Sequence, residues 1–185
     1  MTEDQDRQRF QQVVLPHLDD ALSLARWLTG SVSDGEDVVQ DACLRAFAAI
    51  GSAGDANPRA WLMTIVRNTA FTWLAKNRPK TLIVTDDDSE FEEARREVTG
   101  RVDGQTPESL LLAKADFEML HGAIASLPLP FREVIVLREI EGFGYREIAQ
   151  IAAIPVGTVM SRLARARSLL IQRIGTMHSG QEGAA

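Results

Sequence analysis

The sequence contains only one cysteine and three histidines among its 185 residues. The single cysteine, Cys43, cannot form an intramolecular disulfide, which excludes a disulfide-stapled scaffold and favours a reducing compartment. The histidines are scattered, and none stands in the spacing of a metal site. No apolar run approaches the ~18 residues that span a bilayer, and the N-terminus has acids in place of a secretory signal. We therefore expect a cytoplasmic protein without a metal or a cofactor.

The motifs of common enzyme chemistries are missing as well. No glycine-rich phosphate loop precedes a helix, and no nucleophile elbow is present. The composition, with 45% hydrophobic and 25% charged residues, is that of an ordinary globular protein. An enzyme is therefore not expected, and a binding function is favoured.

Charge is distributed unevenly along the chain, whose formal net charge is -6. Residues 81–108 include nine acids and three bases, so this segment alone equals the net charge. On either side lies a window without acids that carries only basic charges, 56–85 and 148–181. Two basic windows joined by an acidic segment suggest two surfaces that contact a polyanion, although basic residues also gather on solvated helix faces.

Apolar residues recur at helical spacing, and no strand pattern competes. The sequence predicts an all-α fold of two small helical domains, 8–80 and 109–175, joined by an acidic flexible linker over 81–108 and followed by a disordered tail over 176–185. The first domain is expected to contain a helix over 7–29, a helix capped by Ser33 with Glu36, and a helix from Asn57-Pro58 to Arg78. In the second domain we expect helices over 110–125, 131–140, 145–152 and 156–174.

The stretch YREIAQIAAIPVGTVMSRLARAR, residues 145–167, has the spacing of a helix-turn-helix. Pro155 stands where a second helix can begin. On that helix one face contains Thr158, Ser161, Arg162 and Arg165, away from the apolar Val159 and Leu163. Arginine can bridge guanine O6 and N7 or bind phosphate, and serine and threonine can bond to either. The face therefore suits a DNA major groove, and a solvated amphipathic helix is the alternative.

Two parts of the sequence resemble the extracytoplasmic-function group of bacterial sigma factors, in the sigma-70 family. FREVIVLREIEGFGYREIAQIAAIPVGTVMSRLARARSLL is similar to sigma region 4, with its IPxGTV turn and SRLxRAR helix. LPHLDDALSLARWLTGSVSDGEDVVQDACLRAF followed by NPRAWLMTIVRNTAFTWL is similar to region 2. The two resemblances cover most of 10–80 and 110–172 in the expected order, so together they are far more specific than either alone.

The resemblance implies partners and site residues. Region 2 would bind the clamp helices of the RNA polymerase core β′ subunit through Asp37, Gln40 and Asp41, for which a solvated acidic face is the alternative. Its last helix would capture the −10 strand of promoter DNA, with Asn68 at a flipped base and with contacts from Arg59, Trp61, Arg67, Phe71, Lys76 and Arg78. Trp61 also suits a core position, because Leu62 and Ile65 flank it.

The resemblance further implies that region 4 binds the polymerase β flap and reads the −35 element. The residues on its second helix would be Thr158, Met160, Ser161, Arg162, Ala164, Arg165 and Arg167. Met160 and Ala164 replace a basic and a larger side chain that are frequent in the family, and they can offer only apolar contacts, for example to a thymine methyl. Ala153 replaces the usual turn glycine.

The function expected from the resemblance is promoter-specific transcription initiation, with an anti-sigma factor as regulator. An autonomous helix-turn-helix regulator is the alternative, and the resemblance of 33–50 to a polymerase-docking segment argues against it. A sigma mimic that titrates an anti-sigma factor would be expected to carry a receiver domain, for which this chain has no room.

Overall fold

The computed structural model describes residues 3–53, 56–78 and 118–182, with side chains as far as Gly175. These residues form helices and turns, and no strand occurs among them, so the all-α prediction is confirmed. None of the described helices is long and apolar enough to cross a membrane. We call residues 3–78 the N-terminal unit and residues 118–182 the C-terminal unit. The acidic segment 81–108 lies outside the described residues.

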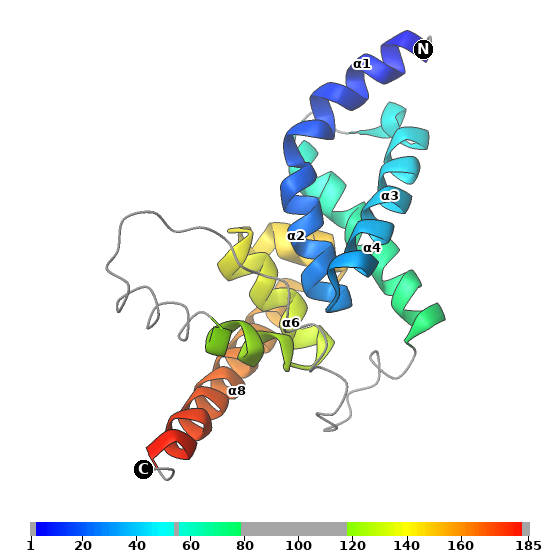
Figure 1. The fold of residues 1–185 in the computed structure, drawn as a ribbon. Helices are drawn as coiled ribbons and strands as arrows, with labels where there is room; N and C mark the ends of the chain where they lie inside the picture. The colour runs from blue at the N-terminus through cyan, green and yellow to red at the C-terminus, as the bar shows by residue number, and fades with distance from the viewer. Residues whose placement is uncertain (1–2, 54–55, 79–117, 183–185) are drawn as a thin grey trace, which may run out of the picture.

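The N-terminal unit is a bundle of α2, α3 and α4, from which α1 extends at one end (Figure 1). Leu24, Leu28, Leu62 and Leu74 are completely buried between these helices. Phe10 of α1 packs edge-on against Phe47 of α3, with ring centroids 5.6 Å apart. The elements of this unit are α1 (Glu3–Val13), η1 (Leu15–His17), α2 (Leu18–Thr29), α3 (Val32–Ala48), η2 (Ile50–Ser52) and α4 (Pro58–Asn77).

The ends of these helices confirm two sequence predictions and contradict two others. The predicted helix end at residue 29 is confirmed, because Gly30 ends α2 with φ 73°, and the predicted start at Asn57-Pro58 is confirmed, because the Asn57 side chain caps α4. The single helix expected over 7–29 is wrong, because Pro16 has no amide hydrogen to donate and a short 3-10 turn separates α1 from α2. The cap expected at Ser33 is also wrong: Ser31 caps α3, where its Oγ accepts from the Asp34 amide at 3.3 Å.

The C-terminal unit begins with a helix over 118–125 and continues with four elements. These are α6 (Leu129–Ile135), η5 (Val136–Ile140), α7 (Tyr145–Ala152) and α8 (Val156–Glu182). The element η5 is a wide π turn that continues α6, in which the Glu141 amide donates to the Val136 carbonyl at 2.9 Å. The helix α8 is longer than the sequence pattern indicates and runs into the segment expected as a tail.

The helix-turn-helix formed by α7 and α8 has the predicted apolar core. Ile148, Ile151, Val159 and Leu163 are all at most 1% exposed. Between the helices Ala153 takes the left-handed conformation, with φ 54°, at the position where glycine is usual. The chain therefore makes this turn with a residue that carries a Cβ.

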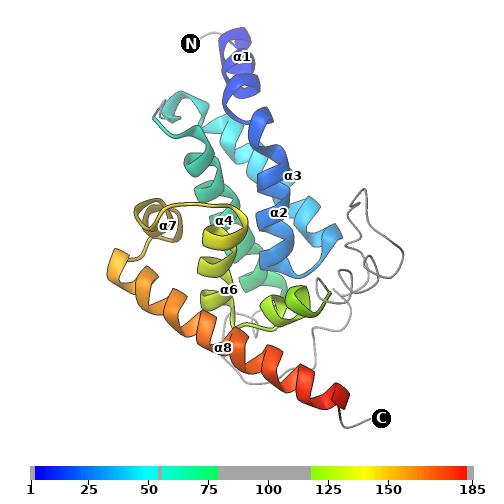
Figure 2. The ribbon, with the colours of Figure 1, turned by 90° about the vertical axis from the view of Figure 1, so that its left-hand side faces the viewer.

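The two units pack against each other, and their buried side chains form one continuous hydrophobic core. The helix α7 lies against α4, and α6 lies between α2 and α8 (Figure 2). This arrangement, which we call the closed form, brings the helix expected to read the −10 strand next to the C-terminal unit.

Candidate nucleic-acid interface

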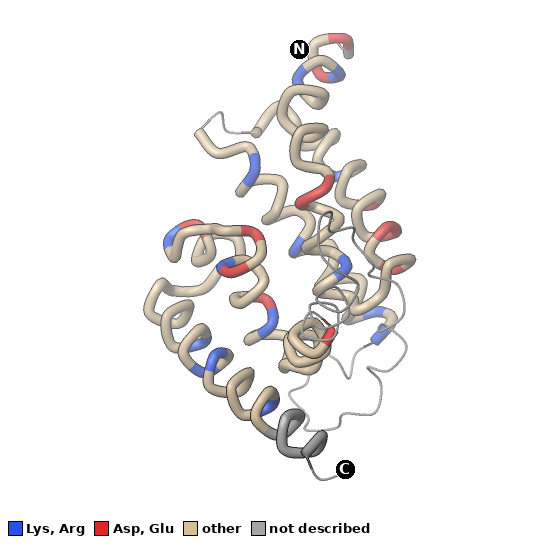
Figure 3. Tube along the Cα trace, turned by 60° about the vertical axis from the view of Figure 1, so that its left-hand side comes forward, with Lys and Arg blue, Asp and Glu red and all other residues tan. Residues whose placement is uncertain are grey.

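The face of α8 expected to read the −35 element is open to solvent at most positions. Met160, Ser161, Ala164, Arg165 and Arg167 are exposed, and Met160 keeps 54% of its surface. Thr158 and Arg162 are half-buried. The charged residues of this helix as far as Gly175 are all basic (Figure 3). The structure therefore brings the seven predicted residues together along one helix and leaves their face accessible to a partner.

One member of this set has an acidic neighbour. The Arg167 guanidinium donates to Glu139 Oε1 at 2.7 Å, and both side chains are about half exposed. Hydrogen bonding to Glu139 raises the pKa of Arg167 above its ordinary value. An exposed pair of this kind stabilises the fold little, so Arg167 can exchange the carboxylate for a phosphate.

Arg59, at the start of α4, is held by acids of both units. Its Nε donates to Asp20 of α2 at 2.6 Å, and its Nη2 donates to Glu141 Oε2 at 3.0 Å. Its Nη1 also donates to the Glu141 backbone carbonyl at 2.8 Å. The guanidinium lies over the Phe143 ring, 4.3 Å from the centroid. Each of the three guanidinium nitrogens of Arg59 thus donates a hydrogen bond within the closed form.

Arg67, two turns further along α4, is also bound by an acid of the C-terminal unit and an aromatic ring. Its Nε donates to Glu133 Oε1 of α6 at 2.5 Å, and the guanidinium stacks over Phe71 at 3.8 Å. Its Nη1 also donates to the Oδ1 of Asn68 at 3.2 Å. Asn68 itself is exposed, as its predicted role in base capture requires.

The remaining predicted residues of α4 differ in exposure. Lys76 is exposed. Arg78 is paired with Asp34 at 2.9 Å and lies near the Trp73 ring. Trp61 is partly buried and packs against the core, which agrees with the core position that its apolar neighbours in the sequence also suggest. Two of the three arginines of the predicted −10 set are therefore bound by acids of the C-terminal unit, and the third by an acid of its own unit.

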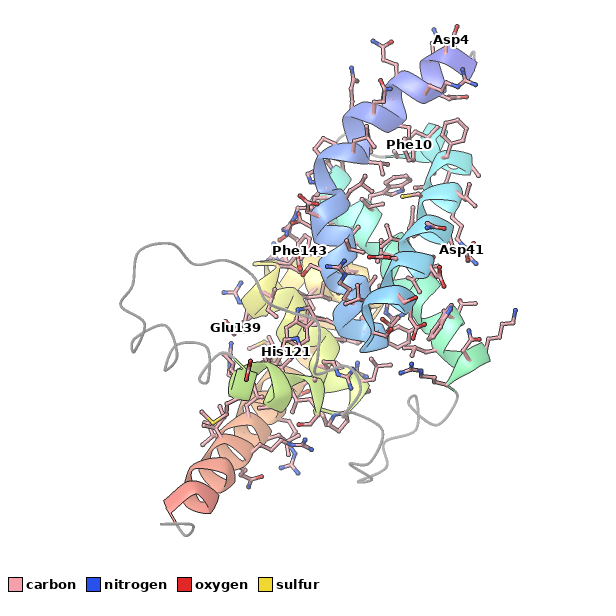
Figure 4. All side chains as sticks on the ribbon, in the orientation of Figure 1. Asp4, Phe10, Asp41, His121, Glu139 and Phe143 are labelled. Atoms are coloured by element: carbon pink, nitrogen blue, oxygen red, sulfur yellow. The ribbon has the colours of Figure 1, made fainter. Side chains whose placement is uncertain are left out.

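The residues expected to bind polymerase form an exposed patch on α3. Asp37, Gln40 and Asp41 are all exposed, and Asp41 lies on the outer side of the bundle (Figure 4). The sequence analysis missed Leu44, which stands three residues after Asp41 and is 71% exposed. In the sequence, Leu44 could have been recognised because it lies outside the apolar stripe of an amphipathic helix. An apolar side chain beside acids suits a protein partner.

Glu133 and Glu141 were also missed by the sequence analysis. Their side chains are only 1% and 3% exposed, respectively. Burial raises the pKa of both acids; the Arg67 hydrogen bond opposes this for Glu133, and those from Ser23 and Arg59 oppose it for Glu141. Within the described residues, Glu133 Oε2 is buried without a hydrogen-bond partner. The closed form therefore holds two carboxylates in an environment that disfavours their charge.

Two further polar contacts join the units. Asn57 caps α4 with its Oδ1, and its Nδ2 donates to Glu147 Oε1 at 2.6 Å; the other carboxylate oxygen of Glu147 caps α7. The buried Arg132 donates to the carbonyls of Leu127 and Trp27. Burial lowers the pKa of Arg132 to about 10, with a smaller effect of Arg173, so the side chain stays charged at neutral pH.

A largely apolar cleft of about 460 Å³ lies between the units. One side is formed by Trp27 and Val32, and the other by Leu120, Ile124 and Ile140. At this cleft the Trp27 ring stacks on His121, with centroids 4.3 Å apart. A partner that fills the cleft would contact both units at once.

Comparison with known proteins links both units to one family. A family model described as Sigma-70 region 2 matches residues 13–80, and one described as Sigma-70, region 4 matches residues 117–170. The chain is 34% identical over 168 residues to the RNA polymerase sigma-H factor of Pseudomonas aeruginosa, covering 89% of this chain and 86% of that one. It is 35% identical over 175 residues to the ECF RNA polymerase sigma-E factor of Escherichia coli, covering 91% and 88%.

Two solved structures are similar in fold. One is the sigma factor RpoE in complex with the anti-sigma factor NepR from Bartonella quintana, with a TM-score of 0.68 and 26% identity. It covers 90% of this chain and 96% of that chain. The other is CnrH in complex with the cytosolic domain of CnrY, with a TM-score of 0.56, 27% identity and coverage of 90% and 88%.

Proposed function

Because the chain belongs to the extracytoplasmic-function group of the sigma-70 family, we propose that it binds RNA polymerase core and directs initiation at specific promoters. The observation that carries this proposal is the presence of both promoter-contacting regions, in family order, with an exposed basic face on α8. The chain acts as a specificity subunit in the cytoplasm and performs no catalysis of its own.

The −35 element is read by α8. Arg165 and Arg162 contact guanine or phosphate, and Thr158 and Ser161 bond to base edges or to the backbone. Met160 and Ala164 lie on the exposed side of the same helix and add apolar contacts, for which a thymine methyl is the matching group. Arg167 leaves Glu139 for a phosphate.

The −10 strand is captured by α4. Asn68 is exposed and has an amide that can pair with a base edge. Arg59, Arg67, Lys76 and Arg78 follow the phosphates, and Phe71 offers a ring for stacking. The patch of Asp37, Gln40 and Asp41, together with Leu44, binds the β′ clamp helices, and the C-terminal unit binds the β flap.

An anti-sigma factor regulates the chain in this proposal. The similar RpoE from Bartonella quintana was solved with the anti-sigma factor NepR, which supports the same kind of partner here. The cleft between Trp27 and Ile140 supports it further, because one apolar helix placed there would contact both units.

Reconstituted transcription tests the proposed function. Core polymerase and the purified chain, supplied with fragmented genomic DNA from the source organism, should yield run-off transcripts from a small set of promoters that core alone does not give. Binding of the chain to duplex DNA without any promoter-dependent transcript would instead favour an autonomous helix-turn-helix regulator. If the chain gave no promoter-dependent transcripts and also bound no DNA, both hypotheses would be wrong.

A further inference from the structure

The exposed side of α8 has arginines at its two edges and uncharged residues between them. The helix packs on α6 and α7, it buries Val159, Leu163 and Ala166, and one of its sides is free of the other described helices (Figure 2). With about 100° of rotation per residue, the exposed residues from 157 to 167 follow one another around the axis in the order Arg167, Met160, Ala164, Gly157, Ser161 and Arg165. We call the four residues between the arginines the central strip.

The two arginines suit the walls of a major groove. They lie about 160° apart around the helix axis, as residues two positions apart do, and two phosphate backbones border a major groove. Arg167 already binds the Glu139 carboxylate at 2.7 Å, and carboxylates and phosphates accept the same guanidinium hydrogen bonds. With one arginine toward each backbone, the central strip points to the base edges on the groove floor.

The central strip has little capacity for hydrogen bonding to bases. The thioether of Met160 is only a weak acceptor, and Ala164 and Gly157 have no polar side-chain atom. The Ser161 hydroxyl donates to the Thr158 carbonyl at 3.1 Å, so its oxygen remains available only as an acceptor. Met160 nevertheless keeps 54% of its surface exposed. The strip therefore distinguishes base pairs mainly through apolar contacts.

The C5-methyl group of thymine is the apolar group that base pairs present in the major groove. 5-Methylcytosine has the same methyl group at the same ring position, whereas cytosine and uracil have a hydrogen there. Met160 has three rotatable side-chain bonds and a polarisable sulfur, so it can pack closely on such a methyl group. Ala164 stands one turn further, about 6 Å along the axis, and base pairs repeat about every 3.4 Å, so the two side chains reach neighbouring base pairs.

We propose that Met160 and Ala164 make −35 recognition depend on C5-methyl groups, so that the chain accepts 5-methylcytosine in place of thymine and discriminates against uracil and unmethylated cytosine. The inference rests on the proposed function, in which α8 reads the −35 element, and it names the chemical group that is read. The ligand class is duplex DNA with C5-methylated pyrimidines. Methylation of a cytosine within the −35 element therefore strengthens a promoter for this chain.

Replacement of thymine by deoxyuridine is the direct experiment, because it removes one methyl group and keeps every hydrogen-bonding group of the base. The probe is a duplex with the upstream half of the strongest promoter found by run-off transcription, in which each thymine upstream of the −10 element is replaced in turn. Core polymerase with the native chain should bind about fourfold more weakly when a contacted thymine is replaced, which is the effect of one buried methyl group. Competition followed by fluorescence anisotropy measures the ratio of the two affinities.

Substitution of the two apolar residues tests which side chain senses the methyl group. Met160→Ala should bind the thymine and uracil duplexes equally at one sensitive position, whereas Met160→Leu, which keeps an apolar side chain of similar size, should retain the discrimination. Ala164→Gly should abolish the discrimination at a neighbouring base pair. Both residues are exposed, so the core is not disturbed, and circular dichroism verifies that the helices remain.

Two matched controls lie on the same helix. Ile171 is also apolar and is 72% exposed, but it stands three turns beyond Met160. Ile171→Ala should therefore leave the ratio of thymine to uracil affinities unchanged. Arg165→Ala should weaken binding to both duplexes by the same factor, because an arginine at a phosphate does not sense the methyl group. These variants separate loss of methyl sensing from general loss of affinity.

5-Methylcytosine tests the second half of the proposal. At each sensitive position the thymine–adenine pair is replaced by a cytosine–guanine pair, with or without the C5-methyl group. The native chain with core polymerase should bind the methylated pair about fourfold tighter than the unmethylated pair. Met160→Ala should not distinguish the two pairs at its own position. Run-off transcription from the same templates should change in the same direction.

Selective loss of methyl discrimination in the Met160→Ala and Ala164→Gly variants supports the inference. The inference is wrong if no thymine replacement changes the affinity by more than about 1.5-fold, if discrimination persists in both variants, if Ile171→Ala abolishes it as well, or if cytosine methylation has no effect. In each of these cases promoter-dependent transcription by the native chain leaves the proposed function intact. Absence of any promoter-dependent transcript counts against the proposed function, and the inference that rests on it fails as well.

Discussion

Arg67 Nε lies 2.5 Å from Glu133 Oε1, and this pair joins α4, the helix expected to hold the −10 strand, to α6 of the C-terminal unit. The two residues are 66 positions apart in the chain. Glu133 is buried and Arg67 is half-buried in the closed form, so their pairing determines what either one can bind.

The closed form should respond to pH because of its two buried acids. Burial raises the pKa of Glu133 against the effects of Arg67 and Arg162, and it raises the pKa of Glu141, which Asp20 raises further and Arg59 opposes. The closed form thus takes up protons more readily than a form with exposed acids. Its stability relative to the open form is therefore greatest in acid and is lost as the pH rises through the raised values.

This dependence can be measured as the radius of gyration, or as energy transfer between labels on the two units, across a pH series. The native chain should be most compact at the acid end that still preserves the fold. Glu133→Gln cannot ionise and should show a flatter profile, whereas Glu139→Gln should behave as the native chain does. If the radius of gyration of the native chain increased as the pH was lowered, the expected direction of the pH dependence would be wrong.

The two promoter-reading assignments can be separated by single substitutions. Arg165→Ala should weaken binding to a duplex with the −35 element by about 1–3 kcal/mol and leave single-strand capture nearly intact. Asn68→Ala should do the reverse, because its amide reads the melted strand. Abortive-initiation assays on promoters with mutated −10 or −35 elements measure both effects. If each substitution weakened recognition of both elements equally, the residue assignments would be wrong, whereas the family membership would be unaffected.

Ala153 offers a stabilising substitution. A residue with a Cβ in the left-handed region is strained by about 1 kcal/mol, and glycine relieves that strain. Ala153→Gly should raise the free energy of unfolding by up to about 1 kcal/mol, measured by urea denaturation. Ala164→Gly, in the interior of α8, is the control, and it should lower stability by a similar amount.

Gly35 of α3 lies close against α2 at Arg26. A Cβ built there would lie 2.8 Å from Arg26 Cγ and 3.0 Å from the Arg26 backbone nitrogen. Gly35→Ala should therefore destabilise the chain by about 1–3 kcal/mol, although alanine is the better helix former. Gly157→Ala, where nothing lies within 4 Å, should instead stabilise by a few tenths to about 1 kcal/mol. Thermal denaturation followed by circular dichroism would compare them, and a stabilised Gly35→Ala would show that the helices can separate there.

The local features of the fold could be predicted from the sequence. The helix-turn-helix follows from an apolar spacing, a proline and a short helix within 23 residues, and the cap at Asn57 follows from two adjacent residues. The break between α1 and α2 also has a local signal, Pro16 itself. The apolar pattern continues on both sides of this proline, and it was this pattern that favoured a single helix over 7–29. Ser31 and Ser33 are equally good caps by residue type, so sequence alone does not choose between them.

The contact between the units could not be predicted from the sequence. Arg59 and Glu141 are 82 positions apart, and each has the ordinary interpretation of a charged residue on a solvated helix face. The packing of the C-terminal unit against α2 and α4 makes them neighbours. The basic window around Asn68 is visible in the sequence, but whether its arginines are accessible depends on which acids fold onto them.

The wide turn η5 sets how the acids of the C-terminal unit meet α4. Glu133 and Glu141 are eight positions apart, as are Arg67 and Arg59, and the pairs run in opposite chain directions. In an uninterrupted α-helix, residues eight apart point about 80° apart around the axis, and a turn with more residues per revolution reduces that angle. The wide turn thus sets the angle at which the two acids meet α4. Related chains that lack arginine at both α4 positions are expected to have an ordinary α-helix here.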